Sequence, residues 1–428
     1  MVLPREPVYL AEAPLHMTER RQDVWRSLHW RSWLKNPERR IVAFALDDSV
    51  LAWCSEPDVV SLLDLKLLDG SAVQLKDKLR ECLATHIRCR SRVTALCFGC
   101  AVLKEGSATL GFRRSVRRRS QATLQLLAIG LESGRIRIHL ADSGQLVTEL
   151  LDHVVAVKDL AFSPSDSACQ SLLLSCSNDS TLKLWNMCDG GNMFRTLQGH
   201  RDGEFVLCCC WSPDGLWAAS GGTDCILVVW RTRDWSISHR LKLHRNFVVD
   251  CEFSPDAALV ISCSHDTTAV IFDHIKGVPL VTLRHEIPIP RTVFACSINE
   301  HNVLDLSISS DGKHIVTLCS DGNMRVWNIA SPQLPCKVLP VRKATSVSYS
   351  RDGTAIAVCL SNGEVQLFSA PMSVQRLSFL CRKKLRFSFC WDKLQHCLLP
   401  SVLRSFLAYD ELRHFRDCRP VLPSVEEQ

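Results

Sequence analysis

Five stretches of the chain share one layout, and this internal repeat constrains the fold more than any other feature of the sequence. Each stretch reads as an apolar strand, a turn, a second apolar strand, a tight polar turn and a third strand that ends in an aromatic residue. The first turn is rich in serine, proline, aspartate and glycine, which favour turns. A unit that recurs every roughly 40 to 55 residues is typical of a four-stranded blade. The five aromatic residues are Trp185, Trp230, Phe272, Trp327 and Phe368.

Two weaker copies of the same layout precede the five. One covers residues 41–54, and the other covers residues 93–98 together with 126–139. Seven such units predict an all-β, seven-bladed propeller over residues 41–371. The seventh unit offers three clear strands before its end. We therefore expect the N-terminal segment, residues 1–40, to supply the fourth strand from about residues 23–33, which closes the ring and removes an open sheet edge.

The repeat resembles that of the WD-repeat family. Gly199 and His200 match the family's Gly-His pair, and Trp185 and Trp327 stand where the family has its Trp-Asp tryptophan. The resemblance implies that a histidine, a serine or threonine, the turn aspartate and the tryptophan form a buried hydrogen-bond network within a blade, which serves packing rather than catalysis. In one set Phe272 replaces the tryptophan and lacks its N–H donor. The network residues so implied are His153, Asp179 and Trp185; His200, Asp224 and Trp230; His244 and Asp266; and Asp321 and Trp327.

The composition is that of a globular protein that is neither disulfide-rich nor membrane-embedded. Hydrophobic residues make up 46% of the 428 residues, and no apolar run approaches the ~18 residues that a membrane span needs. The 22 cysteines fall mostly within apolar stretches, where a thiol acts as a small buried hydrophobic group. The N-terminus lacks the pattern of a secretory signal. We therefore expect an intracellular protein, cytoplasmic or nuclear, with reduced thiols and no membrane partner.

A basic insert is predicted over about residues 70–120, within the second blade. It contains five arginines between Arg113 and Arg119. Such a run can be a solvated surface loop, a nuclear-localisation signal or a phosphate-binding patch, and a nucleic-acid-associated protein is therefore one alternative for this chain. No aromatic residue is interleaved with the arginines, and the net charge is only +6. We therefore expect no nucleic-acid partner.

Sequence motifs for catalysis are not found. The chain has no phosphate-binding loop, no nucleophile elbow and no His-Glu-x-x-His. Cys97 and Cys100 form a single Cys-x-x-Cys without the second pair that a structural zinc site needs, and they fit the end of a blade strand. We therefore expect a non-catalytic binding protein without a cofactor or a metal.

After the seventh unit, the period of the apolar residues changes from that of strands to that of helices. Leu377, Cys381 and Leu385 are spaced i, i+4 and i+8, which places them in one stripe of a helix. Residues 403–407 give a second apolar stripe, and Pro400 suits the first turn of that last helix. The segment is too small to bury a core alone, so it must pack on the propeller or on another protein.

This C-terminal segment, residues 372–412, resembles a SOCS box, the module by which substrate receptors attach to elongin B/C and a cullin. Its elongin-binding half has a leucine, a small residue four positions later and an apolar residue four after that, which Leu377, Cys381 and Leu385 match. Of the cullin-binding Leu-Pro-apolar-Pro only Pro400 is kept, so elongin binding is matched more closely than the choice of cullin-5. The resemblance implies elongin contacts at Leu377, Leu380, Cys381 and Leu385, and cullin contacts at Leu399, Pro400 and Leu403.

A propeller followed by a SOCS box and a short tail, residues 413–428, resembles the family of WD-repeat and SOCS-box-containing proteins. That resemblance implies a substrate-recognition subunit of an elongin B/C–cullin–RING ubiquitin ligase, in which the propeller binds an unidentified protein substrate. Loops on one face of the propeller are the expected contacts, with Arg201, Arg245 and Arg291 as candidates. The alternative is a WD-repeat scaffold without a ligase role, whose C-terminal helices only cap the propeller.

Overall fold

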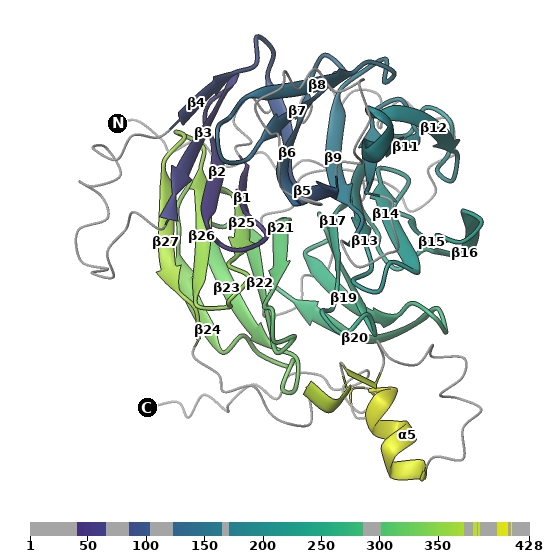
Figure 1. The fold of residues 1–428 in the computed structure, drawn as a ribbon. Coiled ribbons are helices and arrows are strands. Elements are labelled where there is room, and N and C mark those ends of the chain that lie inside the picture. The colour runs from purple at the N-terminus through teal and green to yellow at the C-terminus, as the bar shows by residue number, and fades with distance from the viewer. Residues whose placement is uncertain are drawn as a thin grey trace, which may run out of the picture. The chain divides into compact units, whose positions relative to one another are not determined.

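The structure, a computed structural model, describes residues 41–65, 85–102, 123–164, 171–285, 301–371, 380–382, 384–385, 400–409 and 412. Within these residues the strands form seven antiparallel sheets, in each of which strands adjacent in sequence pair with one another. Six sheets have four strands, and the last along the chain has three. Each sheet is one blade, so the predicted seven-bladed propeller is confirmed (Figure 1).

The first four blades each have four strands. Blade 1 contains β1 (Val42–Phe44), β2 (Val50–Glu56), β3 (Val59–Asp64) and β4 (Thr85–Arg88). Blade 2 contains β5 (Val93–Val102), β6 (Thr123–Leu131), β7 (Ile136–Leu140) and β8 (Leu146–Leu150). Blade 3 contains β9 (Val157–Phe162), β10 (Leu172–Ser177), β11 (Leu182–Asn186), the 3-10 helix η2 (Met187–Asp189) and β12 (Asn192–Leu197). Blade 4 contains β13 (Val206–Trp211), β14 (Trp217–Gly222), β15 (Leu227–Arg231) and β16 (Ser236–Leu241).

The remaining blades are followed by one α-helix. Blade 5 contains β17 (Val248–Phe253), β18 (Val260–Ser264), β19 (Thr268–Asp273) and β20 (Val278–Arg284). Blade 6 contains β21 (Val303–Ile308), β22 (His314–Cys319), β23 (Asn323–Asn328) and β24 (Lys337–Pro340). Blade 7 contains β25 (Ala344–Tyr349), β26 (Ala355–Leu360) and β27 (Val365–Ser369), and the helix is α5 (Ser401–Leu407). None of the described helices has the length and apolar character of a membrane span.

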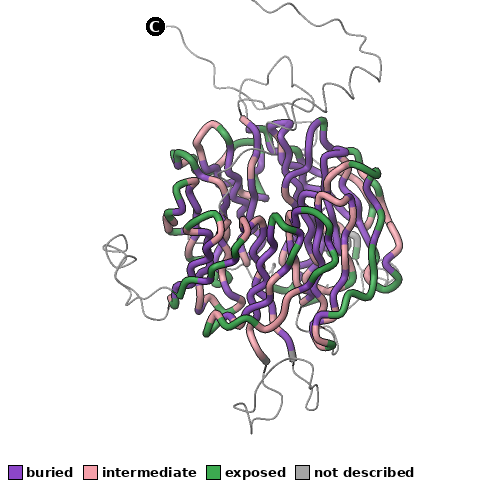
Figure 2. Tube along the Cα trace, turned by 90° about the horizontal axis from the view of Figure 1, so that it is seen from above, coloured by how far each residue is buried: buried purple, intermediate pink, exposed green. Residues whose placement is uncertain are grey.

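Burial on both faces explains why the strands are so rich in apolar and small residues. The first strand of each blade contacts the first strand of the next, and β25 of blade 7 contacts β1 of blade 1. A blade therefore lies between two neighbours, and both of its faces pack. In β14, for example, Ala218, Ala219 and Ser220 are all buried. Figure 2 shows buried residues along the strands and exposed residues mainly at the turns and outer edges.

Blades 1 and 7 are joined by contacts that close the ring. The carboxylate of Asp48 accepts hydrogen bonds of 2.7 Å from the backbone N–H groups of Arg351 and Asp352. Trp53 of blade 1 packs in one apolar cluster with Cys359 of blade 7. Gly363 has a φ of 86°, and a Cβ there would lie 1.9 Å from the carbonyl oxygen of Ser55, so only glycine fits. Residues 23–33 lie outside the described residues, so the fourth strand of blade 7 stays a prediction.

Acidic residues on the inner strands link neighbouring blades. Asp159 of β9 accepts a hydrogen bond of 2.9 Å from the backbone of β13. Asp250 of β17 and Glu252 of the same strand accept bonds of 3.0 and 2.7 Å from the backbone of β21, and Asp305 of β21 accepts one of 2.7 Å from β25. These carboxyl groups satisfy backbone donors that the strand pairing within a blade leaves free. They hold adjacent blades in register.

The predicted insert over residues 70–120 is divided by two strands of the propeller. β4 completes blade 1 and β5 begins blade 2, so residues 85–102 belong to the sheets rather than to an insertion. β5 is apolar and mostly buried, whereas β4 buries only Ile87 and belongs to blade 1 through its pairing with β3. The remaining parts, including the arginines from Arg113 to Arg119, lie outside the described residues.

Candidate protein-interaction site

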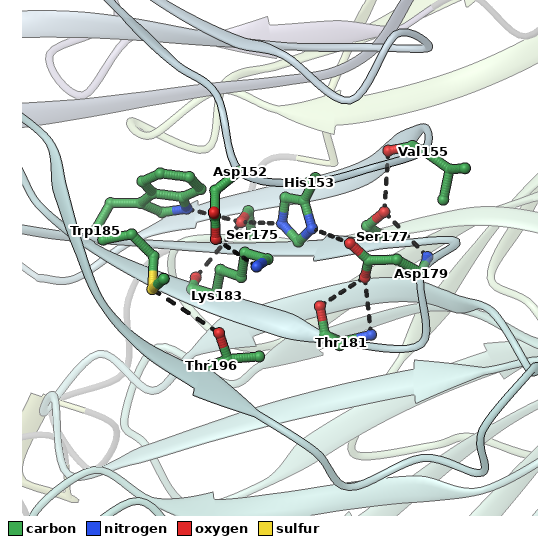
Figure 3. Close-up of polar contacts among 11 residues, drawn as sticks. Asp152, His153, Val155, Ser175, Ser177, Asp179, Thr181, Lys183, Trp185 and Thr196 are labelled. Carbon is green, nitrogen blue, oxygen red and sulfur yellow. Dashed lines mark hydrogen bonds and ion pairs between the residues drawn. The ribbon is translucent and has the colours of Figure 1, made fainter.

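The first blade network lies in blade 3 and joins four side chains (Figure 3). His153, in the loop before β9, places its Nδ1 2.7 Å from the carboxylate of Asp179 and its Nε2 2.7 Å from the hydroxyl of Ser175. Trp185 donates its indole N–H to the same hydroxyl at 2.8 Å. One proton arrangement satisfies every atom: Nδ1–H donates to Asp179, and the serine hydroxyl donates to Nε2 while accepting from the tryptophan.

Blades 4 and 5 repeat this arrangement. His200 lies 3.0 Å from Asp224 and 2.9 Å from the hydroxyl of Ser220, to which Trp230 donates at 3.0 Å. In blade 5, His244 lies 3.1 Å from the carboxylate of Asp266 and 2.8 Å from the hydroxyl of Ser262. Phe272 takes the place of the tryptophan there and is fully buried. The serines were not located from the sequence, although each tryptophan follows its serine by ten positions.

In blade 6 the network is divided into two parts. Trp327 donates to the hydroxyl of Thr317 at 3.0 Å, and His285 lies 2.8 Å from the same hydroxyl. The other ring nitrogen of His285 donates to the carbonyl oxygen of Thr267 rather than to an aspartate. Asp321 is instead bonded to Arg325 at 2.5 Å and to His301 at 3.2 Å. The structure therefore places Asp321 and Trp327 in one blade but in separate bonding groups.

The electrostatics of these networks fit a structural role. Burial alone would favour the neutral carboxyl, but the hydrogen bond and charge of His153 outweigh it and lower the pKa of Asp179 to about 2. His244 lowers the pKa of Asp266 to about 2 in the same way against the effect of burial. Burial lowers the pKa of His285 to about 3, so its ring is neutral. Satisfied, buried side chains of this kind fix the packing of a blade and offer no group to a ligand.

The Cys-x-x-Cys pair also fits a structural role. Cys97 and Cys100 both lie within the blade strand β5. Burial raises the pKa of the Cys97 thiol to about 12. A thiol in that state is a poor nucleophile at neutral pH. The described ranges contain no group of three or more His, Cys, Asp or Glu side chains arranged to hold a metal ion.

The candidate elongin- and cullin-binding residues that the structure describes are exposed. Residues 380–382 and 384–385 are helical, and Leu380 and Leu385 are 44% and 38% exposed. Cys381 between them is exposed as well. Pro400 is exposed directly before α5, and Leu403 within that helix is 48% exposed. Leu377 and Leu399 lie outside the described residues.

The opposite side of the same segment is buried. Leu407, Tyr409 and Leu412 are almost fully shielded from solvent. Arg382, next to the exposed Cys381, is also buried, and its guanidinium lies 3.9 Å from the ring centre of Phe406 and 3.7 Å from that of Tyr409. The described residues of the segment therefore include both packed and exposed side chains. The apolar pattern of the sequence does not predict the burial of Arg382.

The arginines expected to contact a substrate are placed only in part. Arg201 and Arg245 are exposed in the loops that precede β13 and β17. The backbone N–H of Arg245 donates to Asp266 at 2.8 Å, so the third blade network holds this loop in place. Arg291 lies outside the described residues.

Comparisons with known proteins agree with the repeat, and the names of several relatives include a SOCS box. The family model for the WD domain, G-beta repeat, matches residues 144–186, 191–231, 235–273 and 292–328. The chain is 33% identical over 394 residues to WD repeat and SOCS box-containing protein 1 of Homo sapiens, with 87% of this chain and 91% of the relative covered. The Danio rerio protein of that name is 31% identical with the same coverage. Apoptotic protease-activating factor 1 of Rattus norvegicus is 27% identical over 58% of this chain and 18% of its own length.

Proposed function

The chain belongs to the family of WD repeat and SOCS box-containing proteins, and on that premise we propose that it is the substrate-recognition subunit of an elongin B/C–cullin–RING ubiquitin ligase. In this proposal the propeller binds the target protein. The C-terminal segment binds elongin B/C and a cullin, for which cullin-5 is the candidate. The chain itself supplies no catalytic residue.

The observation that carries the proposal is the exposure of apolar residues in the C-terminal segment. Leu380, Cys381 and Leu385 are exposed on a helical stretch, although two of the three are large apolar residues. A segment that only caps the propeller gains stability by burying its apolar side chains, and exposing them has a cost in water. Exposed apolar residues beside a small thiol instead fit a helix that inserts into the groove of a partner.

We assign the substrate to the loops at the other end of strand β17 from the C-terminal segment. Strand β17 begins after the loop that carries His244 and Arg245, and it ends at the turn that carries Asp256. Asp256 accepts a hydrogen bond from Tyr409 of the C-terminal segment. The loop with Arg245 therefore lies at the far end of the strand from the C-terminal segment. A substrate bound at those loops and a ligase bound at the segment do not compete for one surface.

The mechanism that follows is catalysis by proximity. The RING protein on the cullin brings a conjugating enzyme charged with ubiquitin. A substrate lysine amine attacks the thioester, an isopeptide bond forms, and the thiol of the conjugating enzyme leaves. The receptor makes this encounter intramolecular and so raises the effective concentration of the lysine. We place the protein in the cytosol or nucleus, where thiols stay reduced.

Co-purification with elongin B/C and cullin-5 tests the proposal. Wild-type chain is expected to retain both partners, whereas Cys381→Arg and Leu385→Asp lose them. The matched control is Leu334→Asp, because Leu334 is a 50% exposed leucine of the propeller and its loss leaves the C-terminal segment intact. Unchanged melting of the propeller shows that each variant is folded. If wild-type chain retains no elongin, the C-terminal helices are a structural cap and the scaffold alternative holds.

A further inference from the structure

The turn between the first two strands has the same internal bond in four blades. A serine hydroxyl donates to an aspartate two positions later, at distances between 2.5 and 2.7 Å. One carboxylate oxygen is enough for this bond and for the backbone N–H groups that it also accepts. The second oxygen can bind another partner, as that of Asp352 does by accepting a hydrogen bond from the Thr354 hydroxyl. The pairs are Ser212 and Asp214 in blade 4, Ser254 and Asp256 in blade 5, Ser309 and Asp311 in blade 6, and Ser350 and Asp352 in blade 7.

The turn of blade 5 differs from the other three in its surroundings. Asp256 is 0% exposed and Asp311 is 8% exposed, whereas Asp214 is partly exposed and Asp352 is exposed. The next residue is Ala257, which adopts a positive φ of 55°, where the other three turns have a glycine. A left-handed alanine costs about 1 kcal/mol or more. This turn therefore has a strained backbone and a buried methyl group where the other turns have a glycine. Both features indicate a turn that is covered.

The cover is the C-terminal segment. The hydroxyl of Tyr409 donates to the second carboxylate oxygen of Asp256 at 2.7 Å. Burial, together with the charge of Asp256, raises the pKa of Tyr409 well above its usual range, so the hydroxyl stays a donor. The guanidinium of Arg382 stacks on the Tyr409 ring from the helical stretch that carries Cys381 and Leu385. One bond and one cation–π contact thus link the propeller turn to the proposed elongin-binding helix.

We propose that Asp256, Tyr409 and Arg382 are positioning residues, which fix the elongin-binding stretch at one place on the turn between β17 and β18. The inference rests on the proposed function for its biological meaning. The contacts of Tyr409 with Asp256 and of Arg382 with Tyr409, here called the latch, are a property of the chain without its partners. A latched segment presents the conjugating enzyme to the propeller from one direction. A merely tethered segment would let it sample many directions, with a lower effective concentration at any one lysine.

Amide hydrogen exchange on the full-length chain tests the latch directly. Asp256→Asn keeps an oxygen for the turn but replaces the acceptor of Tyr409 with an amide NH₂, and Tyr409→Phe removes the donor. We expect amides of residues 401–409 to exchange about tenfold faster in both variants, because a hydrogen bond to a carboxylate is lost. The matched control is Asp214→Asn, which makes the same change in the turn of blade 4 and should leave that exchange as in wild type.

A reconstituted ligase gives a second readout that a purely structural role would not move. With elongin B/C, cullin-5, a RING protein and a charged conjugating enzyme, the modified propeller lysines are mapped by mass spectrometry. Asp256→Asn and Tyr409→Phe should keep the elongin affinity within about twofold and spread ubiquitin over more lysines than in wild type.

The outcomes separate the latch from the ligase role. Wild-type exchange at residues 401–409 in both variants would overturn the latch, whether or not elongin binds. Faster exchange with an unchanged set of modified lysines would overturn the positioning role. Loss of elongin binding in wild-type chain would instead refute the proposed function, while the exchange experiment would still decide whether the latch exists.

Discussion

Trp230 donates its indole N–H to Ser220 at 3.0 Å, and the two residues stand ten positions apart in adjacent strands of blade 4. The same hydroxyl is bonded to His200. In blade 5 the matching hydroxyl of Ser262 is bonded to His244, but Phe272 offers it no donor. One serine therefore organises two buried partners and the other organises one.

Removing the two hydroxyls should therefore have unequal effects. Ser220→Ala leaves both an indole N–H and an imidazole nitrogen without a partner, and each such loss costs about 1–3 kcal/mol. Ser262→Ala leaves only the imidazole nitrogen of His244 without a partner. We expect Ser220→Ala to destabilise the propeller by at least about 1 kcal/mol more, measured by urea denaturation. The exposed Ser133→Ala should be neutral. Equal losses for the two buried serines would contradict the assigned network.

Glu252 should make the propeller less stable as the pH rises. Burial, with the charges of Asp305 and Asp159, outweighs the hydrogen bond from Ile308 and raises its pKa from 4.5 to about 8. Between these two values the folded chain keeps a proton that the unfolded chain has lost, so stability falls with rising pH across this window.

Glu252→Gln keeps an oxygen for Ile308 and does not titrate. Relative to wild type, we expect its stability to improve between pH 4.5 and 8 by up to about 2 kcal/mol, since Glu252 is only partly buried and solvent screens the effect. Denaturation curves over this pH range measure the difference. A constant gap between the two proteins would show that Glu252 titrates normally.

Binding of a cullin by the segment can be tested independently of binding of elongin B/C. Leu403→Asp changes an exposed residue of α5, so the helix should remain packed. We expect the cullin-5 affinity of the chain with elongin B/C to fall about tenfold or more, as for loss of an apolar interface anchor, with elongin binding unchanged. Pull-down of each partner at graded concentrations is the measurement. Loss of elongin as well would place Leu403 in the other interface.

Blade 7 provides a test of the predicted ring closure. Its strand β27 has no fourth strand beside it among the described residues, and we expect residues 23–33 to pair with it. Deletion of residues 1–37 should then lower the melting temperature by several degrees, because an apolar sheet edge becomes exposed. Deletion of residues 413–428 serves as the control. A melting temperature that is unchanged by the N-terminal deletion would refute the closure.

Local spacing explains which parts of the molecule could be predicted from the sequence. The repeat sets the blades. Asp179 and Trp185 follow from it because the same aspartate-to-tryptophan spacing recurs in the next blade, and His153 precedes its aspartate by 26 positions compared with 24 for His200. His285 escaped prediction because 32 positions separate it from Thr317, compared with 22 between His153 and Ser175. A longer connection between blades 5 and 6 hides the shared geometry.

The contact between Tyr409 and Asp256 could not be predicted at all. The two residues are 153 positions apart, and no local pattern marks either as a partner of the other. An aspartate in a turn and a tyrosine after a helix are each explained by local structure. Only the packing of the C-terminal segment brings them together, and the alanine after Asp256 is the one sequence signal that sets this turn apart.

Calorimetric titration of the purified full-length chain with the elongin B/C heterodimer tests the central claim most directly. We expect saturable binding with a stoichiometry of one, which Cys381→Arg abolishes and Leu334→Asp leaves unchanged. Absence of binding by the wild-type chain, at concentrations where it is folded, would contradict the ligase role and leave a WD-repeat scaffold with a helical cap.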